Sequence, residues 1–262
     1  MSARPEVPAP PTALGTVLRV LDVSVRFGGI QALDAVSLDV EAGRVSGLIG
    51  PNGAGKTTLF NVITGMERPG HGRVELLGQD VTALPPHRRA RLGLARTFQR
   101  LEVFGSLSAR DNILAAAEFR RGWARDGSHP VHVTEEIVDR LGLRAVADSR
   151  VDALPTGLAR LVELGRALAT RPRVMLLDEP GSGLDTAETA VLADLLLELA
   201  AGDTAVLLVE HDVDLVMQIC DPVCVLDFGR VIATGTPRQV QADGAVQAAY
   251  LGAAPELINE AG

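Results

Sequence analysis

The chain has 262 residues, enough for one large domain or for one domain with a subdomain. Hydrophobic residues make up 47% of it and aromatic residues only 3%, which predicts a large aliphatic core. The formal net charge of −8 argues against a general nucleic-acid surface, and also against binding to anionic lipid through a basic patch. No apolar run reaches the length needed to cross a bilayer.

Residues 1–15 are rich in proline and lack the apolar centre of a signal peptide, so we expect a disordered leader there. Residues 16–262 are expected to form a single domain. Its two cysteines, Cys220 and Cys224, are a poor metal site by themselves. We interpret them as buried, reduced thiols of a cytoplasmic protein.

The domain begins with short strands, predicted at residues 18–20, 23–25 and 36–40 from their alternating apolar pattern. Phe27 stands on a loop between them, upstream of the glycine-rich stretch described next. It is placed to stack on the adenine of a nucleotide. The alternative is a core or hairpin aromatic without a ligand.

A glycine-rich stretch follows the apolar strand predicted at residues 45–49 and precedes a helix that ends at Gly65. It fits the phosphate-binding pattern G-x-x-x-x-G-K-[ST]. Glycine permits the tight loop whose backbone N–H groups converge on phosphates. Lys56 should reach the β- and γ-phosphates, and the Thr57 hydroxyl should hold Mg²⁺. The alternative is a glycine-rich turn that matches by chance. The predicted nucleotide-binding residues are Gly50, Pro51, Asn52, Gly53, Ala54, Gly55, Lys56, Thr57 and Thr58.

A hairpin is predicted near residues 70–78, followed by a short basic helix from Pro85 that carries Arg88, Arg89 and Arg91. We interpret this charge run as a solvated face. A strand at residues 95–98 then ends at Gln99. From about residue 103 to 171 the pattern is helical. A first helix is expected to begin near residue 109, and two more are expected at residues 134–142 and 157–170. This block is predicted to be a helical subdomain inserted into a core formed by residues 16–102 and 172–262.

Strands then alternate with helices again: buried strands at residues 174–177 and 205–209, helices at 187–200 and 213–220, and a hairpin at 223–233. Such alternation predicts a mainly parallel sheet flanked by helices. The predicted fold class is therefore α/β, a P-loop NTPase with N-terminal antiparallel strands and an inserted helical subdomain.

Polar side chains follow three predicted strands at the edge where ligands bind in open α/β sheets. Asp178 is placed to hold Mg²⁺ through water, and Glu179 to polarise the attacking water. Gln99 offers an amide to Mg²⁺ or water, and His211 is placed to reach the γ-phosphate. An acidic pair at a strand end and a solitary structural histidine are both common alternatives. Beside the phosphate loop, however, the set favours hydrolysis.

The order of these motifs resembles the ATP-binding subunit of an ABC transporter, over nearly the whole chain from about Val17. The quoted motifs are the phosphate loop, Gln99, Leu154-Pro155-Thr156-Gly157, Asp178-Glu179, Leu184-Asp185 and His211. Residues 97–101 and the ending Gly235-Thr236-Pro237…Ala249-Tyr250-Leu251-Gly252 are most similar to subunits of branched-chain amino-acid importers.

The resemblance implies a role for each motif. Phe27 would stack on the adenine of ATP, and Gln99 would be the Q-loop residue. Asp178 and Glu179 would be the Walker B pair, Asp185 the D-loop residue and His211 the switch histidine. Such subunits work as head-to-tail dimers in which each ATP lies between the phosphate loop of one copy and the signature of the other. The resemblance therefore implies that Gly157 and Asp185 also bind the nucleotide.

The resemblance also implies partners and a location. The chain would pair with itself or with a sibling ATPase, and its helical insert would contact membrane-spanning permease subunits. A solute-binding protein would be an indirect partner, and nucleic acid would not be one. The chain would lie in the cytoplasm, at the inner face of the cell membrane.

One motif departs from the family. The signature Leu-Ser-Gly-Gly-Gln is here Leu154-Pro155-Thr156-Gly157-Leu158, without the serine hydroxyl and the glutamine. Gly157 and the start of the next helix remain, and a helix N-terminus attracts phosphate. One lost hydrogen bond to a charged group costs roughly 1.5–3 kcal/mol. We therefore hypothesise that the chain works best opposite a sibling with a fuller signature.

The predicted function is ATP hydrolysis that drives uptake of branched-chain or related amino acids through separate membrane subunits. An ABC ATPase for urea, an amide or another small solute is an alternative. So is a non-transport ABC ATPase, although the coiled coil, second cassette or basic face that would favour it is not visible. An interaction module that binds ATP without useful hydrolysis is the third. Neither the solute nor the direction of transport follows from the residues themselves.

Overall fold

The structure is a computed structural model that describes residues 15–124, 126–202 and 204–251. Except for Gly15, the predicted leader lies outside the described residues, as does Gly252. Among the residues that are described, no helix combines the length and apolarity that a bilayer span requires.

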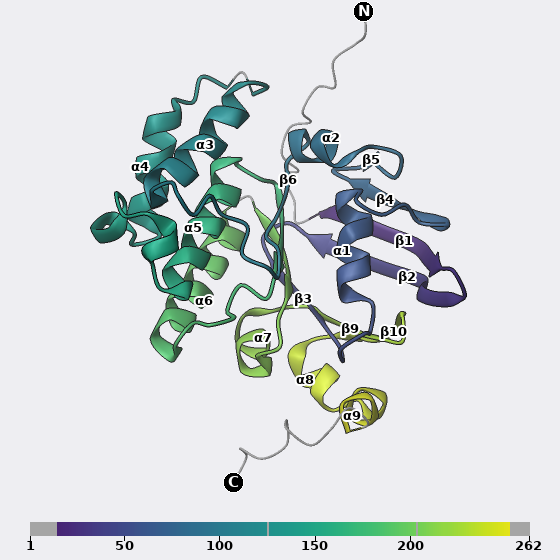
Figure 1. The fold of residues 1–262 in the computed structure, drawn as a ribbon. Helices are drawn as coiled ribbons and strands as arrows, with labels where there is room; N and C mark the ends of the chain where they lie inside the picture. Colours follow the sequence, from purple (N-terminus) through teal and green to yellow (C-terminus); the bar gives the residue numbers. More distant parts are fainter. Residues whose placement is uncertain (1–14, 125, 203, 252–262) are drawn as a thin grey trace, which may run out of the picture.

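An antiparallel sheet in the order β2-β1-β4-β5 forms one side of the molecule (Figure 1). Its strands are β1 (Thr16–Phe27), β2 (Ile30–Glu41), β4 (His71–Leu76) and β5 (Gln79–Asp80). The two strand segments predicted at residues 18–20 and 23–25 belong to one strand, β1. The pairing register with β2 shifts between Val20 and Val23, where Asp22 has a φ of 53°. This irregularity explains why the sequence pattern reads as two pieces.

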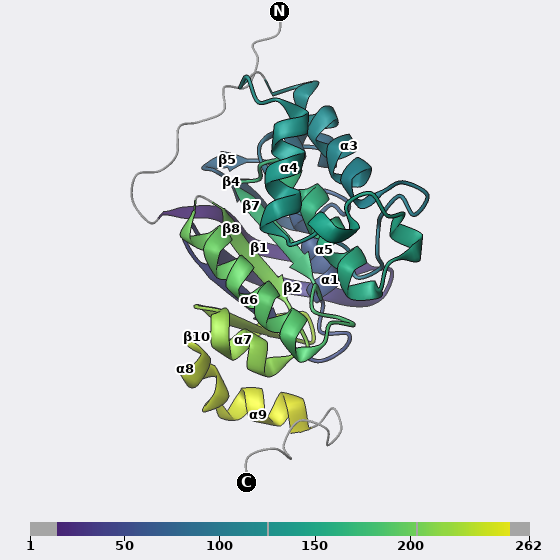
Figure 2. The same cartoon turned by 90° about the vertical axis from the view of Figure 1, so that its left-hand side faces the viewer.

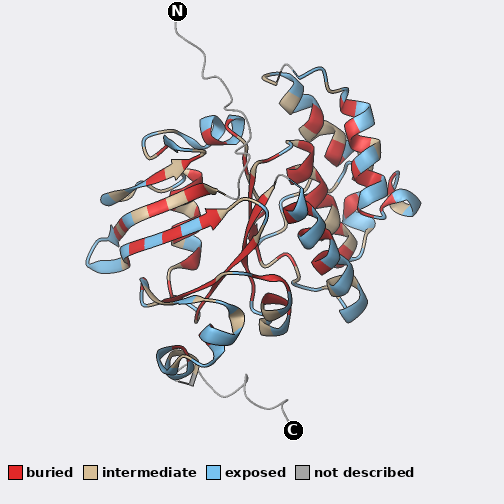
Figure 3. Cartoon of the chain, turned by 180° about the vertical axis from the view of Figure 1, so that it is seen from behind, coloured by how far each residue is buried: buried red, intermediate tan, exposed pale blue. Residues whose placement is uncertain are grey.

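A six-stranded sheet in the order β10-β9-β3-β8-β7-β6 forms the centre. Its strands are β3 (Val45–Ile49), β6 (Leu94–Arg96), β7 (Val174–Asp178), β8 (Ala205–Val209), β9 (Val223–Asp227) and β10 (Arg230–Gly235). Every residue of β3, β7 and β8 is buried, and only β10 pairs antiparallel. Figure 3 shows this burial along the central strands. The predicted fold class is confirmed.

Two hydrophobic clusters hold the layers together. The first buries α1 (Lys56–Thr64), with Leu59, Phe60, Val62 and Ile63, between the antiparallel sheet and one face of the central sheet. The second covers the opposite face with α5 (Thr156–Ala169), α6 (Thr186–Ala201) and α7 (Val213–Ile219). Figure 2 shows α6 crossing that face beside β7 and β8. Two further helices, α8 (Pro237–Gln241) and α9 (Gly244–Leu251), lie at the C-terminal end.

The inserted helices α3 (Ala109–Arg121), α4 (Pro130–Arg140) and α5 pack on one another. Two short 3-10 turns at Arg144–Val146 and Val151–Ala153 connect α4 to α5. A Cβ atom at Gly165 would lie 2.9 Å from side-chain atoms of Ile113 and of Leu141, so glycine permits this close approach. The helices lie where the sequence places the subdomain, and its boundaries at residues 103 and 171 stay predictions. Helix α4 begins at Pro130 rather than Thr134, because proline suits the first turn of a helix.

The interpretation of the basic run as a solvated face is wrong for Arg89. This arginine lies in α2 (Pro86–Arg91) and is only 1% exposed. Its guanidinium donates hydrogen bonds to the carbonyls of Val62 and Ile63, both at 2.7 Å, at the C-terminal end of α1. Burial lowers the pKa of Arg89 to about 10. Arg89 therefore fixes α2 against the helix that leaves the phosphate loop, since a cation stabilises unpaired carbonyls there.

Candidate active site

The glycine-rich loop connects β3 to α1 with a backbone that glycine alone adopts easily. Gly50, Gly53 and Gly55 have φ values of 152°, 80° and 109°. A Cβ atom at Gly50 would lie 2.0 Å from the carbonyl oxygen of Leu226, and one at Gly55 would lie 2.7 Å from that of Ala32. Helix α1 begins directly after Gly55, so its unpaired N–H groups open onto the loop.

Lys56 is the first residue of α1 and is 8% exposed. Its Nζ donates hydrogen bonds to the carbonyls of Gly50 at 2.6 Å and Pro51 at 3.0 Å. Burial lowers the pKa of Lys56, while nearby Glu179 and Asp178 oppose that shift. The ammonium group thus lies folded over the loop, and its contact with phosphate stays a prediction. Thr57 and Thr58 follow in the first turn of α1, and the Thr57 side chain is exposed.

Gln99, Glu179 and His211 meet at the C-terminal edge of the central sheet. Gln99 Nε2 lies 3.4 and 3.3 Å from the two carboxylate oxygens of Glu179, and His211 Nε2 lies 2.6 Å from Oε1. The three follow β6, β7 and β8, which are neighbours in the sheet. The structure therefore brings together the three predicted catalytic residues, and their roles in catalysis stay predictions.

Glu179 has an unusual backbone. Its φ of 52° lies in the left-handed region, which costs free energy for a residue with a side chain. Its N–H donates to the carbonyl of Val209 at 2.8 Å, which holds the turn after β7 against the end of β8. Strain of this kind is concentrated at functional sites.

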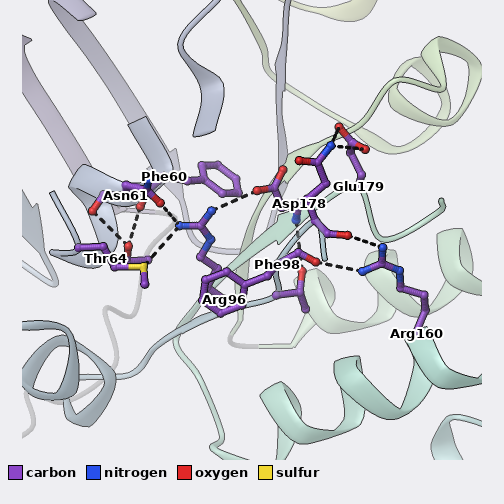
Figure 4. A network of polar contacts seen from close by, with 11 residues as sticks. Phe60, Asn61, Thr64, Arg96, Phe98, Arg160, Asp178 and Glu179 are labelled. Carbon is purple, nitrogen blue, oxygen red and sulfur yellow. Dashed lines mark hydrogen bonds and ion pairs between the residues drawn. The ribbon is translucent and has the colours of Figure 1, made fainter. Parts of the chain in front are cut away.

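Two charged residues near this cluster escape the sequence analysis. Arg96 Nη2 lies 3.1 Å from Asp178 Oδ2 (Figure 4). Glu210, 7% exposed, accepts hydrogen bonds from the N–H groups of Gly181 at 2.6 Å and His211 at 3.1 Å. Burial raises the pKa of Glu210 and of Asp178, although Arg96 opposes the shift at Asp178. The sequence signal that could have pointed to Arg96 and Glu210 is a charged residue at the end of an apolar strand.

The residues predicted to hold Mg²⁺ fit that ion chemically. Thr57, Gln99 and Asp178 offer hydroxyl, amide and carboxylate oxygens, the hard ligands that Mg²⁺ prefers. Arg96 engages Oδ2 of Asp178, whereas Oδ1 accepts no hydrogen bond from the described residues. Protein sites for Mg²⁺ use one or two carboxylates beside substrate phosphates. The described part of the chain holds no group of three or more His, Cys, Asp or Glu residues suited to a metal.

Phe27, Gly157 and Asp185 lie outside that cluster of contacts. Phe27 is the last residue of β1 rather than a loop residue, and it pairs with Ile30 across the hairpin turn. Its exposed fraction of 48% excludes a core position. A hairpin position agrees with the structure, and stacking on adenine stays a prediction. Glu188 links the other two. Its carboxylate lies 2.7 Å from where a Cβ atom of Gly157 would stand, and its N–H donates to Asp185 Oδ1 at 2.8 Å. Asp185 thereby begins α6 as its N-cap.

The two cysteines are buried and free, as predicted. Burial raises the pKa of Cys220 to about 12 and that of Cys224 to about 11. Both are therefore protonated thiols at neutral pH and unreactive.

The family model described as "ABC transporter" matches residues 33–182, more than half of the chain. A second model, "Branched-chain amino acid ATP-binding cassette transporter", matches residues 230–256.

The chain belongs to the ABC transporter family.

It is an ABC-type ATPase, and the resemblance drawn from the motifs is confirmed. This ABC subunit is 38% identical, over 91% of its own length and 98% of the relative, to the high-affinity branched-chain amino acid transport ATP-binding protein BraF of Pseudomonas aeruginosa. It is also 40% identical, over 83% of its length and 89% of the relative, to the lipopolysaccharide export system ATP-binding protein LptB of Acidithiobacillus ferridurans.

Solved structures agree with this membership. A nucleotide-free ATP-binding cassette of an ABC transporter superimposes on the ABC subunit with a TM-score of 0.81 at 32% identity, covering 90% of this chain and 99% of that one. A dimeric cassette bound to ADP and phosphate, in a post-hydrolysis state, gives a TM-score of 0.74 at 25% identity, covering 84% and 99%.

Proposed function

We propose that this ATPase hydrolyses ATP to drive the uptake of branched-chain or related amino acids through separate membrane subunits. The contact of Gln99 and His211 with Glu179 carries the proposal, because a carboxylate held between an amide and an imidazole is suited to binding and deprotonating water. The match of residues 230–256 to the branched-chain family model supports the substrate class. So does the name of the relative BraF.

The chain's own residues divide the work. Loop N–H groups and Lys56 bind the triphosphate of ATP, and the exposed ring of Phe27 stacks on adenine. Glu179 accepts the proton of the attacking water, which Gln99 and His211 hold in place. Thr57, Gln99 and Asp178 would hold Mg²⁺, which would supply positive charge to neutralise the phosphates.

The second half of the nucleotide site is proposed to come from another cassette. The dimeric relative supports this pairing. Thr156, the first residue of α5, is exposed and supplies a hydroxyl one position after the missing signature serine. Pro155 and Leu158 still lack the donors of the family signature. We therefore expect the chain to favour a sibling subunit with a fuller signature over a second copy of itself.

Light scattering of the Glu179→Gln protein with ATP and Mg²⁺ tests this preference. A dimer-sized species is expected when the sibling is added, and mostly monomer without it. If the chain alone dimerised equally well, its altered signature would not favour a sibling subunit.

A groove of about 390 Å³ supports a membrane-spanning partner. It runs between α2, α3 and α5, and aromatic residues line it: Phe98, Phe104, Phe119 and Trp123. Phe119 is 70% and Phe104 46% exposed, although large apolar side chains are usually buried. We propose that a helix of a permease subunit fills the groove, which would hold the ATPase at the cytoplasmic face of the membrane.

Phe119→Ser is expected to weaken binding to the permease subunits roughly 10- to 30-fold, because a central aromatic anchor is lost. ATP binding by the isolated subunit should not change. Val131→Ser is the matched control, since Val131 is also exposed but lies on α4 away from the groove. Co-purification from detergent measures both variants. Equal binding by Phe119→Ser and the unchanged protein would contradict this use of the groove.

Uptake assays test the substrate class. Cells that lack this subunit should lose uptake of radiolabelled leucine and regain it with the intact gene but not with Glu179→Gln. Unchanged leucine uptake, with loss of uptake of another small solute, would move the proposal to that solute. Export, as in the name of LptB, would appear as accumulation inside the cell.

A further inference from the structure

Arg96 joins parts of the molecule that lie far apart in the sequence. It ends β6 as a side chain that is only 6% exposed, although arginine is normally a surface residue. Nη2 donates to Asp178 Oδ2 at 3.1 Å, and Nη1 donates to Asn61 Oδ1 at 2.6 Å. The guanidinium also lies over the rings of Phe98 and Phe60, 4.8 and 5.4 Å from their centroids. Figure 4 shows these contacts converging on one side chain.

Stability alone does not account for this arrangement. Removing two charges from water is costly, and a buried ion pair adds little compared with apolar residues of similar volume. Burial lowers the pKa of Arg96, and its Nε has no hydrogen-bond partner among the described residues. A buried arginine whose hydrogen bonds are incomplete contributes little to stability, so we look for a functional role.

The geometry suggests that the task is to orient Asp178. Arg96 fixes Oδ2, whereas Oδ1 accepts no hydrogen bond from the described residues. Asn61 lies in α1, which begins with Lys56 and Thr57. Arg96 therefore fixes the Asp178 carboxylate relative to the helix that follows the phosphate loop. Outer partners of this kind set the direction of a metal-ligating carboxylate.

The same guanidinium reaches the apolar groove. Arg96 and Phe98 both line it, and the Phe98 ring lies against Arg96. The Phe98 carbonyl accepts a hydrogen bond at 2.9 Å from Arg160 of α5, so the backbone is tied to the helical insert while the ring faces the groove. A side chain that enters the groove and displaces the Phe98 ring changes the packing of Arg96.

We propose that Arg96 is a positioning residue that orients Asp178 toward nucleotide-bound Mg²⁺ and links that carboxylate, through Phe98, to the groove. This rests on the proposed function, and it adds a connection separate from the amide of Gln99. An occupant of the groove, through Phe98, and the nucleotide site, through Asp178, would thereby both act on the guanidinium of Arg96.

The test compares nucleotide binding with and without Mg²⁺ in the full chain. Binding of a fluorescent ADP analogue is titrated with Mg²⁺ and repeated in EDTA. Arg96→Lys keeps the charge but loses the planar fork and the stacking. The Mg²⁺ concentration for half-maximal effect should rise about 10- to 100-fold, the range for lost outer partners of metal ligands. Binding in EDTA should change less than about twofold, because the phosphate loop is untouched.

Three further variants make the result specific. Asn61→Ala removes one partner and leaves the ion pair with Asp178, so it should shift the Mg²⁺ requirement in the same direction by less. Phe98→Leu should do likewise if the stacking matters. Arg88→Lys, on the exposed face of α2, is the matched control and should shift nothing.

The outcomes separate the two claims. A lower Mg²⁺ requirement in Arg96→Lys would mean that Arg96 competes with the ion, which overturns the proposal. Equal weakening with and without Mg²⁺ would mean a structural role only, which also overturns it. An unchanged Mg²⁺ requirement in Phe98→Leu would refute the link to the groove. Failure of the unchanged protein to bind the nucleotide would instead overturn the proposed ATPase function.

Discussion

Glu179→Gln is expected to lower ATP turnover by about 100- to 10,000-fold, the contribution typical of a general base. The amide keeps the shape of the side chain and its position beside Gln99 and His211, but it does not accept a proton from water. ATP binding should remain, because Glu179 is not one of the groups that hold the triphosphate. Phosphate release from the assembled transporter measures turnover, and a fluorescent ATP analogue measures binding.

The matched control is Glu136→Gln, the same change at an exposed position on α4. Its turnover should equal that of the unchanged protein. Should Glu179→Gln hydrolyse ATP at the normal rate, another group must act as the base. Among the described residues, His211 would then be the first to examine, since it lies 2.6 Å from Glu179.

Lys56→Ala is expected to weaken ATP binding by roughly 10- to 150-fold, which corresponds to losing 1.5–3 kcal/mol of hydrogen bonding to a charged group. The fold should persist, because the hydrogen bonds that Lys56 Nζ donates within the described part of the chain go to two carbonyls of its own loop. Equilibrium binding of ATP measures the loss, and urea unfolding checks the fold.

Lys56 is the only lysine in the chain, which allows a direct control. Acetylation of the peptide that contains Lys56, followed by mass spectrometry, reports on this one side chain, and ATP should protect it. Labelling that ATP leaves unchanged would place the ammonium group away from the phosphates and contradict the expected loss of affinity.

The sequence predicts the central sheet well where its strands are short, mostly apolar and bounded by turns. The strands at residues 45–49 and 205–209 have the predicted limits. Prediction is poorer where a single side chain or one irregular residue decides the outcome. The kink at Asp22 splits the pattern of β1, and Arg89 turns inward to meet carbonyls of α1, about 27 positions earlier in the chain.

The same distinction applies to the active site. Gln99, Glu179 and His211 can be placed together because each follows a strand of a parallel sheet. Arg96 and Arg160 cannot, because their partners lie far away in the sequence: Asp178 for Arg96, and the Phe98 carbonyl for Arg160. Charge alone does not say which distant group a side chain meets.

The most direct test of the ATPase account is a crystal structure of the chain with a non-hydrolysable ATP analogue and Mg²⁺. The triphosphate is expected within the loop of residues 50–58, with the γ-phosphate facing Glu179, Gln99 and His211. Adenine should lie against Phe27. A nucleotide bound elsewhere, or a γ-phosphate turned away from Glu179, would contradict the account.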